Sequence, residues 1–411
     1  MSKRNIYMLV VVLSVVGCSS SGGSGGGGGV VGADVACSTT ANDSVQTGGG
    51  WSRIHSETNG TSTYHLVNLT RQSTSTVNPL TMDYMVHEPP GGSPTALVVL
   101  IAGGQLTAGI EGTDGLTPTL AGGNFLVRSA HLFAAQGYRV LTIDRPSDYL
   151  DYTFGSGSGW AYDTYRISTE HAVDLSQVIN EVNSLDNLPV VIAGTSRGTI
   201  SAVAQHKLAS VLALSAPLTA GNGSPIGSVG VLPSSVSEPV HVSWHVLDEC
   251  SVTTPTDAQT LVSNLPDAIG VSISGGFASA ASTSTCNADH YHGFPGIESC
   301  AVGQVTDWIA TEVAALPSVR PQASAVADST TMDTGKDIDL TGAATAGAAG
   351  ALTYSLPHGS TSLGGSVTIA GNTVTYTPPM GMNSFVDTFV YVVEEAGGGA
   401  SHNVVAVTIN P

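Results

Sequence analysis

The chain has 411 residues, 41% of them hydrophobic, which is enough for two or three domains and at least one sizeable core. Twelve lysine and arginine residues stand against 31 acidic residues, and the net charge is −19. So few cations cannot neutralise a row of phosphates, which argues against nucleic acid as a partner. The acidic excess is typical of the solvated surface of an exported protein.

The N-terminal segment has the pattern of a secretory signal. Lys3 and Arg4 precede an apolar run that is too short to span a bilayer comfortably, and residues 1–17 are therefore predicted to be a signal peptide. The run ends in Leu-Ser-Val-Val-Gly-Cys, which resembles the bacterial lipobox and implies that Cys18 is lipidated. Three acyl chains suffice for stable anchoring. We expect a protein lipid-anchored at the bacterial cell envelope, with Ser19 after the cysteine favouring the outer membrane; an ordinary signal that happens to contain Cys is the alternative.

Composition divides the rest of the chain. Residues 18–48 are rich in glycine and serine and are predicted to form an unfolded tether. A second change near residues 317–321 separates a domain at 49–318 from a C-terminal region at 319–411.

Apolar runs alternate with helical patterns through the domain at 49–318. The runs predict buried strands at 96–104, 138–144, 189–195, 211–216, 240–247 and 269–275. Helical periods occur at 125–136, 167–185 and 304–316, and a helix is expected after residue 196. Parallel strands need crossover connections, so this alternation predicts the α/β class, with a mostly parallel sheet and helices on both faces.

The segment Gly194-Thr195-Ser196-Arg197-Gly198 fits the G-x-S-x-G pattern of a serine nucleophile. The five letters carry little weight in this composition, because residues 22–26 fit the pattern as well. Ser24 has no strand before it and no helix after it, whereas Ser196 has both. A sharp strand-to-helix turn exposes a hydroxyl at the carboxyl end of a sheet, so we predict Ser196 as a nucleophile.

A serine hydroxyl needs a histidine base and an orienting carboxylate, here expected after Ser196 in the order acid then histidine. Asp248 and Glu249 follow the strand predicted at 240–247. His290 and His292 stand in the loop before the last helix. The residues alone leave both choices open.

Four segments together resemble the α/β-hydrolase superfamily, and within it exported bacterial serine hydrolases of undefined substrate. They are GGNFLVRS at 122–129, DRPSD at 144–148, the GTSRGT turn at 194–199 and HGFPGIE at 292–298. The resemblance covers about residues 50–318.

The resemblance implies cleavage of a carboxylic ester through an acyl-enzyme, with no cofactor. Ser196 would be the nucleophile, His292 the general base and acid, and Asp248 the residue that orients the imidazole. Glu249 is the rival to Asp248, and His290 the rival to His292.

Acyl transfer also requires an oxyanion hole. The amide of Arg197, next after the nucleophile, is one expected donor, and the second is expected from Gly104 or Gln105 after the first buried strand. The substrate is expected to be a small-molecule or polymeric ester held by the loops at 105–124 and 146–165.

The four cysteines beyond Cys18 suggest two disulfides in an oxidising compartment, and three pairings are possible. We predict that Cys250 and Cys286 pair, because the bridge would join the acid loop to the histidine loop, and Cys37 and Cys300 by elimination. The spacings lack the C-x-x-C of a zinc site, and no metal site is predicted.

The C-terminal region has short alternating runs that predict a β-sandwich. Its segments TYTP at 375–378, DTFVY at 387–391 and VAVTI at 405–409 resemble bacterial Ig-like and cadherin-like modules, which act as spacers or adhesion units. Three aspartates in this region are conceivable calcium ligands, although they do not have the spacing of a known calcium site: Asp337, Asp339 and Asp387.

Two alternative functions follow from the C-terminal region. The protein could be a surface adhesion or glycan-binding lipoprotein with a degenerate hydrolase domain. It could also be a polyester depolymerase that uses the Ig-like module to hold a solid surface.

Overall fold

The computed structural model describes residues 29–47, 50–52, 62–76, 78–111, 119–120, 123–149, 159–219, 233–348, 350–396 and 399–411. The predicted signal peptide, the lipidation site Cys18 and Ser24 lie outside the described residues. Within the described part, no helix combines the length and the apolar character that crossing a membrane requires.

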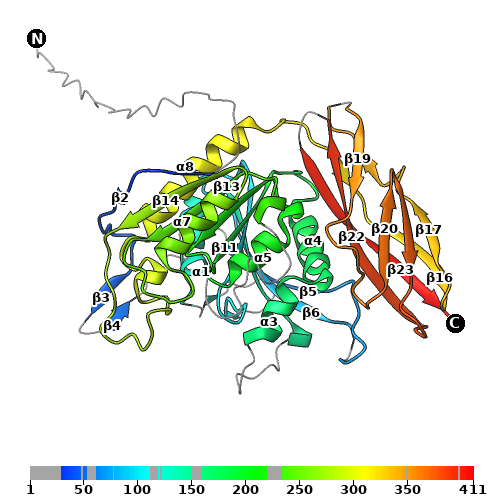
Figure 1. Ribbon diagram of the computed structural model, residues 1–411, viewed down its shortest axis with the longest axis horizontal. Coiled ribbons are helices and arrows are strands. Elements are labelled where there is room, and N and C mark those ends of the chain that lie inside the picture. The colour runs from blue at the N-terminus through cyan, green and yellow to red at the C-terminus, as the bar shows by residue number, and fades with distance from the viewer. Residues whose placement is uncertain are drawn as a thin grey trace, which may run out of the picture.

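A twisted central sheet forms the middle of the molecule, and the described residues contribute ten strands to it (Figure 1). Across the sheet these are β1 (Val30–Val31) and β2 (Val35–Ala36), both on β14 (Ala268–Ser274), then β13 (Val240–His245), β12 (Val211–Ser215), β11 (Val190–Thr195), β7 (Leu97–Ile101), β10 (Arg139–Pro146), β6 (Thr81–His87) and β5 (Ser62–Asn68). Every pair from the β1/β2 edge to β10 is parallel, and β6 is antiparallel to both of its neighbours. The expected mostly parallel sheet is confirmed.

Helices cover both faces of this sheet. The alternating side chains of β7 show the two faces: Leu97, Val99 and Ile101 belong to one buried apolar cluster, and Val98 and Leu100 to another. The first cluster includes α4 (Thr169–Asn183), α5 (Gly198–Ala204) and α7 (Pro255–Asn264). The second includes α1 (Phe125–Arg128), α2 (Ala130–Ala135) and α8 (Glu298–Ala315). Burial on both faces explains why the strands read as continuous apolar runs.

Shorter elements complete this part of the chain. They are α3 (Gly159–Arg166), the 3-10 helices η2 (Ser147–Tyr149), η3 (His206–Leu208), η4 (Pro233–Ser235) and η5 (Tyr291–Gly293), and the hairpin pairs β3 (Val45–Thr47) with β4 (Gly50–Ser52) and β8 (Ile110–Glu111) with β9 (Thr119–Leu120).

The folded part begins before residue 49, which differs from the tether predicted at 18–48. Val30 and Val35 pair with the edge strand β14, opposite Ile269 and Ile273. Gly29 passes so close to α7 that a Cβ there would lie 2.3 Å from the Val262 carbonyl oxygen. The sparse valines among glycines complete an open sheet edge, a long-range pairing that the local composition does not reveal.

The C-terminal region is all β, as expected from its alternating runs. Its strands are β15 (Gln322–Ala323) with β18 (Ala344–Thr345); β16 (Val326–Thr331), β23 (Ala400–Asn410), β22 (Phe385–Glu395) and β19 (Leu352–Ser355) in one sheet; and β17 (Lys336–Asp339), β21 (Thr373–Thr377) and β20 (Ser366–Ala370) in another. Side chains of the two larger sheets, including Ile338, Tyr376 and Val407, share one buried core. Asp387 is fully buried, and its carboxylate accepts hydrogen bonds from Thr361 Oγ1 and Tyr376 OH.

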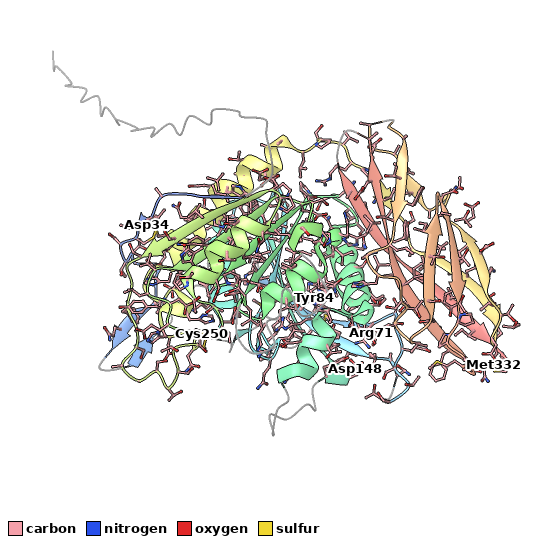
Figure 2. The ribbon with its side chains drawn as sticks, in the orientation of Figure 1. Asp34, Arg71, Tyr84, Asp148, Cys250 and Met332 are labelled. Carbon is pink, nitrogen blue, oxygen red and sulfur yellow. A yellow bond between two sulfur atoms is a disulfide. The ribbon has the colours of Figure 1, made fainter. Side chains whose placement is uncertain are left out.

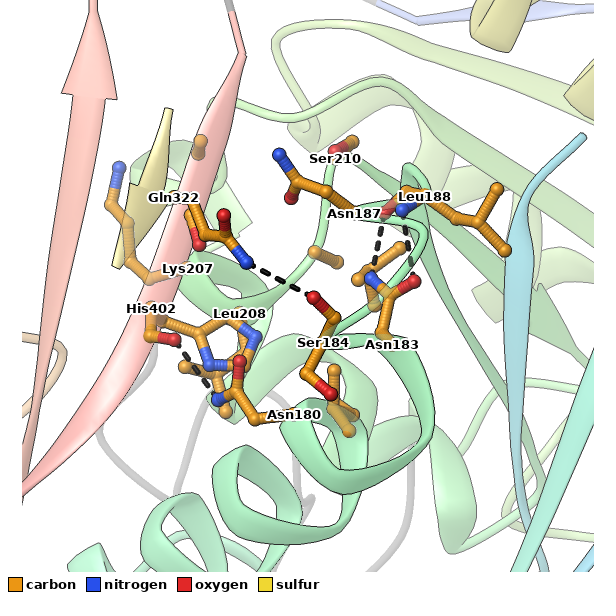
Figure 3. Close-up of a pocket in the computed structure, with 15 residues that line it drawn as sticks. Asn180, Asn183, Ser184, Asn187, Leu188, Lys207, Leu208, Ser210, Gln322 and His402 are labelled. Carbon is orange, nitrogen blue, oxygen red and sulfur yellow. Dashed lines mark hydrogen bonds between the residues drawn. The ribbon is translucent and has the colours of Figure 1, made fainter. Parts of the chain in front are cut away.

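The C-terminal sheets pack directly against α4. Val392 and Val404 belong to the same apolar cluster as the helix. His402 Nδ1 lies 2.8 Å from Ser176 Oγ. Asn180 Nδ2 donates to the carbonyl of His402 over 3.0 Å (Figure 3). The C-terminal region is therefore joined to the rest of the chain by a continuous core.

A buried ion-pair network lies beside this contact (Figure 2). Arg71 Nε is 2.8 Å from Asp174 Oδ1, and Arg71 Nη1 is 2.7 Å from Asp148 Oδ2. Burial raises the pKa of Asp174 to about 6 against the opposing pull of the guanidinium. The paired charges hold α4 and η2 to the loop after β5.

Candidate active site

Ser196 occupies the turn between β11 and α5 with a φ of 51°, a left-handed conformation that strains a residue with a side chain. Its amide donates to the Ser215 carbonyl over 3.0 Å. The two glycines of the pattern are required by close backbone approach: a Cβ on Gly194 would lie 2.4 Å from the Gly198 carbonyl oxygen, and one on Gly198 would lie 2.3 Å from that of Ile101. The packing of the turn thus accounts for the G-x-S-x-G letters.

Asp248 and His292 lie together at the same edge of the sheet. Asp248 follows β13, and His292 lies on η5 between β14 and α8, so both come from loops at the carboxyl ends of parallel strands near β11. His292 Nδ1 is 3.0 Å from Asp248 Oδ2, and each residue is 5% exposed. An Nδ1–H that donates to this carboxylate leaves Nε2 unprotonated and able to accept a proton.

Thr253 contacts both of these groups, although no sequence motif includes it. Its Oγ1 is 2.9 Å from Asp248 Oδ2 and 3.0 Å from His292 Nδ1. The other carboxylate oxygen of Asp248 accepts from the Cys250 amide over 2.9 Å. The carboxylate is therefore fixed by donors on both oxygens, which keeps it oriented toward the imidazole.

The rival residues lie differently. Glu249 is exposed, and among the described residues its carboxylate has no contact with a histidine. The His290 ring packs edge-on against Tyr291, with ring centroids 5.4 Å apart. Of the four candidates, the structure brings Asp248 and His292 together.

Ser196 Oγ forms no hydrogen bond with any residue that the structure describes. The bond between nucleophile and base is often long in unliganded enzymes and shortens when substrate binds. What the structure shows is that Ser196 and the Asp248–His292 pair lie at the same edge of the sheet, at the carboxyl ends of its parallel strands.

The loop after β7 lies against the nucleophile turn. A Cβ on Gly103 would be 3.0 Å from Ser196 Cβ, and Gly104 has a φ of 54°. Within the described chain, the amides of Gly104, Gln105 and Arg197 donate to no backbone carbonyl. The expected oxyanion donors are therefore amides that have no backbone acceptor there.

His245, the last residue of β13, contacts the loop that carries His292. Its Nε2 lies 2.9 Å from the Gly275 carbonyl oxygen, and its ring stacks on Tyr291 with centroids 4.6 Å apart. Burial lowers the pKa of His245, so a neutral ring donates this hydrogen bond at pH 7.

Two disulfides lie around this site. Cys250 pairs with Cys286, and Cys37, after β2, pairs with Cys300 on α8. This is the pairing expected from the sequence. The first bridge links the loop that follows Asp248 to the loop that precedes His292.

Two of the sequence predictions concern a metal site and the loops that hold substrate. The described residues contain no group of three or more His, Cys, Asp or Glu side chains that could hold a metal ion. The loops predicted to hold substrate include residues 112–118 and 150–158, which lie outside the described residues.

No family model and no curated protein matches the chain. Among solved structures, a cold-adapted esterase from an Arctic intertidal metagenomic library is similar at 13% identity, over 64% of this chain and 98% of that chain, with a TM-score of 0.40. A peroxisomal α/β-hydrolase of Saccharomyces cerevisiae is similar at 10% identity, over 63% and 91%, with a TM-score of 0.40. A serine hydrolase without a lid from Xanthomonas campestris is similar at 16% identity, over 59% and 95%, with a TM-score of 0.37. The first neighbour is an esterase and the other two are α/β-hydrolases, but the likeness is weak, and the fold described above rests on its own strand order and connections.

Proposed function

We propose that the protein is a serine hydrolase that cleaves a carboxylic ester through an acyl-enzyme. The observation that carries the proposal is the buried contact between His292 and Asp248 at the sheet edge where Ser196 occupies a strained turn. A carboxylate that fixes a histidine tautomer, at the same sheet edge as a half-buried serine turn, is the arrangement that nucleophilic acyl transfer needs.

The proposed roles follow from these positions. Ser196 Oγ attacks the ester carbonyl while His292 Nε2 takes its proton, and the Asp248 carboxylate stabilises the imidazolium. The amides of Arg197 and of Gly104 or Gln105 hold the oxyanion. His292 then protonates the leaving alcohol, and water, activated by the same imidazole, hydrolyses the acyl-serine.

Turnover of a short-chain nitrophenyl ester tests the proposal. The protein would comprise residues 19–411, which include every described residue. Ser196→Ala is expected to lower turnover by at least about a thousandfold, because the nucleophile is lost. A fluorophosphonate should add one phosphonyl group, located on Ser196 by peptide mass. Equal rates for the two proteins would refute the enzyme and favour the adhesion alternative.

We also propose that the C-terminal sheets form an Ig-like module that contacts a surface or glycan. The motif pattern at 375–409 and the core shared by two sheets support this. Because β22 and β23 share a core with α4, binding to insoluble polyester or glycan should be measured with the whole Ser196→Ala protein. Retention on polyester with release of its hydroxy acids by the wild type would favour the depolymerase; no retention on any surface would argue against the module's role.

The lipid anchor at Cys18 remains part of the proposal. The lipobox-like segment supports it, and the disulfides fit an oxidising compartment. Cys18→Ala should move the protein from the membrane fraction to the soluble fraction and abolish labelling by a palmitate analogue. Unchanged fractionation would contradict the anchor.

A further inference from the structure

A fully buried arginine lies directly behind the loop that faces Ser196. Arg166, the last residue of α3, is 0% exposed. Its Nη2 lies 3.0 Å from the Ala102 carbonyl oxygen, 3.4 Å from that of Gly103 and 3.2 Å from that of Gly104. Its Nη1 donates to Ser201 Oγ over 3.0 Å. One guanidinium therefore donates hydrogen bonds to three successive carbonyls and to the helix that follows the nucleophile.

The orientation of these carbonyls fixes the orientation of the amides. In a trans peptide the C=O of one residue and the N–H of the next point in opposite directions within one plane. When the carbonyls of Gly103 and Gly104 point at Arg166, the amides of Gly104 and Gln105 point away from it. These are the amides expected to bind the oxyanion.

Burial of this charge is unfavourable unless something compensates it. No carboxylate lies within ion-pair distance of Arg166 among the described residues. Asp163, whose charge opposes the effect of burial on the pKa of Arg166, forms its ion pair with the Arg197 side chain. Burial lowers the pKa of Arg166 from its ordinary value. The carbonyl dipoles of the loop supply the compensation, so the cation and the loop conformation stabilise each other.

We propose that Arg166 is a positioning residue that orients the oxyanion-binding loop and holds it in register with the nucleophile turn. The inference rests on the proposed function, since the loop serves an oxyanion only if Ser196 attacks a carbonyl. Two contacts from α3 maintain the register: Arg166 binds the loop and Ser201 on α5, and Asp163 binds Arg197, whose amide is the other donor.

Kinetics of Arg166→Met and Arg166→Lys test the proposal, normalised by titration of active sites with the fluorophosphonate. Arg166→Met keeps the side chain's approximate volume and removes the donors. Because misdirected amides weaken binding of the transition state, we expect kcat per titrated site to fall by about 10- to 100-fold, with little change in KM. Affinity for a trifluoromethyl ketone, whose adduct carries an oxyanion, should fall by the same factor, and Arg166→Lys should restore part of both.

Arg139→Met is the matched control. Arg139 also donates to a carbonyl, that of Val182 over 3.2 Å, but it lies at the opposite, amino end of β10. This variant is expected to keep the wild-type kcat per titrated site. The proposal is overturned if Arg166→Met keeps kcat within about twofold, or if kcat and ketone affinity change independently.

Hydrogen exchange separates this inference from the proposed function. Measured in the Ser196→Ala background, the amide of Leu106, which donates to the Gly103 carbonyl over 3.1 Å, should exchange faster in Arg166→Met than in Arg139→Met. Unchanged exchange would show that Arg166 does not hold the loop, whatever the chemistry. If the wild type lacks Ser196-dependent turnover, the proposed function fails and the catalytic role of Arg166 fails with it.

Discussion

Arg128 Nε lies 2.9 Å from Glu298 Oε1, and the two side chains are 2% and 3% exposed. The pair joins the segments 122–129 and 292–298, two of the four that resemble hydrolase motifs. Arg128 Nη2 also donates to the carbonyl of Gly293, the residue after His292. The two segments therefore contact each other in the interior, and this contact holds the loop that carries His292.

Glu298→Gln is predicted to destabilise the protein strongly. The change leaves the Arg128 guanidinium buried without its counter-charge, so the free energy of unfolding in urea should fall by about 3–5 kcal/mol. The control is Glu88→Gln, which removes one of the two carboxylates that pair with Arg139 and leaves Asp186 as the other partner; the Glu88 side chain is 32% exposed. It should cost about 1 kcal/mol or less. Equal effects in the two variants would contradict a structural role for the buried pair.

Adding Arg128→Met to Glu298→Gln should recover part of the lost stability, because the second change removes the buried cation that Glu298 neutralised. Stabilities that simply add would show that the two side chains do not act as a pair.

Asp248→Asn is predicted to lower kcat by about 10,000-fold while the fold is retained, because an amide no longer fixes the His292 tautomer. Glu249→Gln provides the neighbouring control, since Glu249 is exposed and should leave kcat unchanged. Steady-state hydrolysis of a nitrophenyl ester measures both. The reverse ranking would transfer the acid's role to Glu249.

Replacing both Cys250 and Cys286 with serine is predicted to lower the free energy of unfolding by about 3–4 kcal/mol, as expected for the 36-residue separation that the bridge spans. It should also lower kcat/KM, because the Asp248 loop is no longer tied to the loop before His292. Urea unfolding and ester hydrolysis measure the two effects. Wild-type values of both would mean that the bridge does not position these loops.

Local patterns predicted the features that depend on local physics. The buried strands, the turn at Ser196 and the order of acid and histidine follow from hydrophobic runs and short motifs. Arg166 could not be identified, because an arginine at the end of a short helix looks solvent-exposed, and its partners at 102–104 lie some sixty residues earlier. Thr253 and the edge strands at 30–36 were missed for the same reason, since long-range contacts give them their roles.

His402 at the contact between the C-terminal sheets and α4 predicts acid sensitivity. Burial lowers the pKa of His402 from 6.5 to about 4. Above pH 6.5 the ring is neutral in both the folded and the unfolded chain and has no effect on stability. Between pH 6.5 and 4 the unfolded chain binds a proton that the folded chain excludes, so the free energy of unfolding falls by up to about 1.4 kcal/mol per pH unit.

The free energy of unfolding in urea is compared between pH 7 and pH 4.5. In His402→Gln its decrease per pH unit should be smaller by up to about 1.4 kcal/mol, the contribution of one proton. Burial also lowers the pKa of His358 to about 4, and its Nε2 is 2.9 Å from Gln205 Oε1 across the same contact, so part of the slope should remain. His65→Gln, on the outer strand β5, serves as the control. If His402→Gln and the control keep the same slope as the wild type, proton exclusion at this contact does not govern acid unfolding.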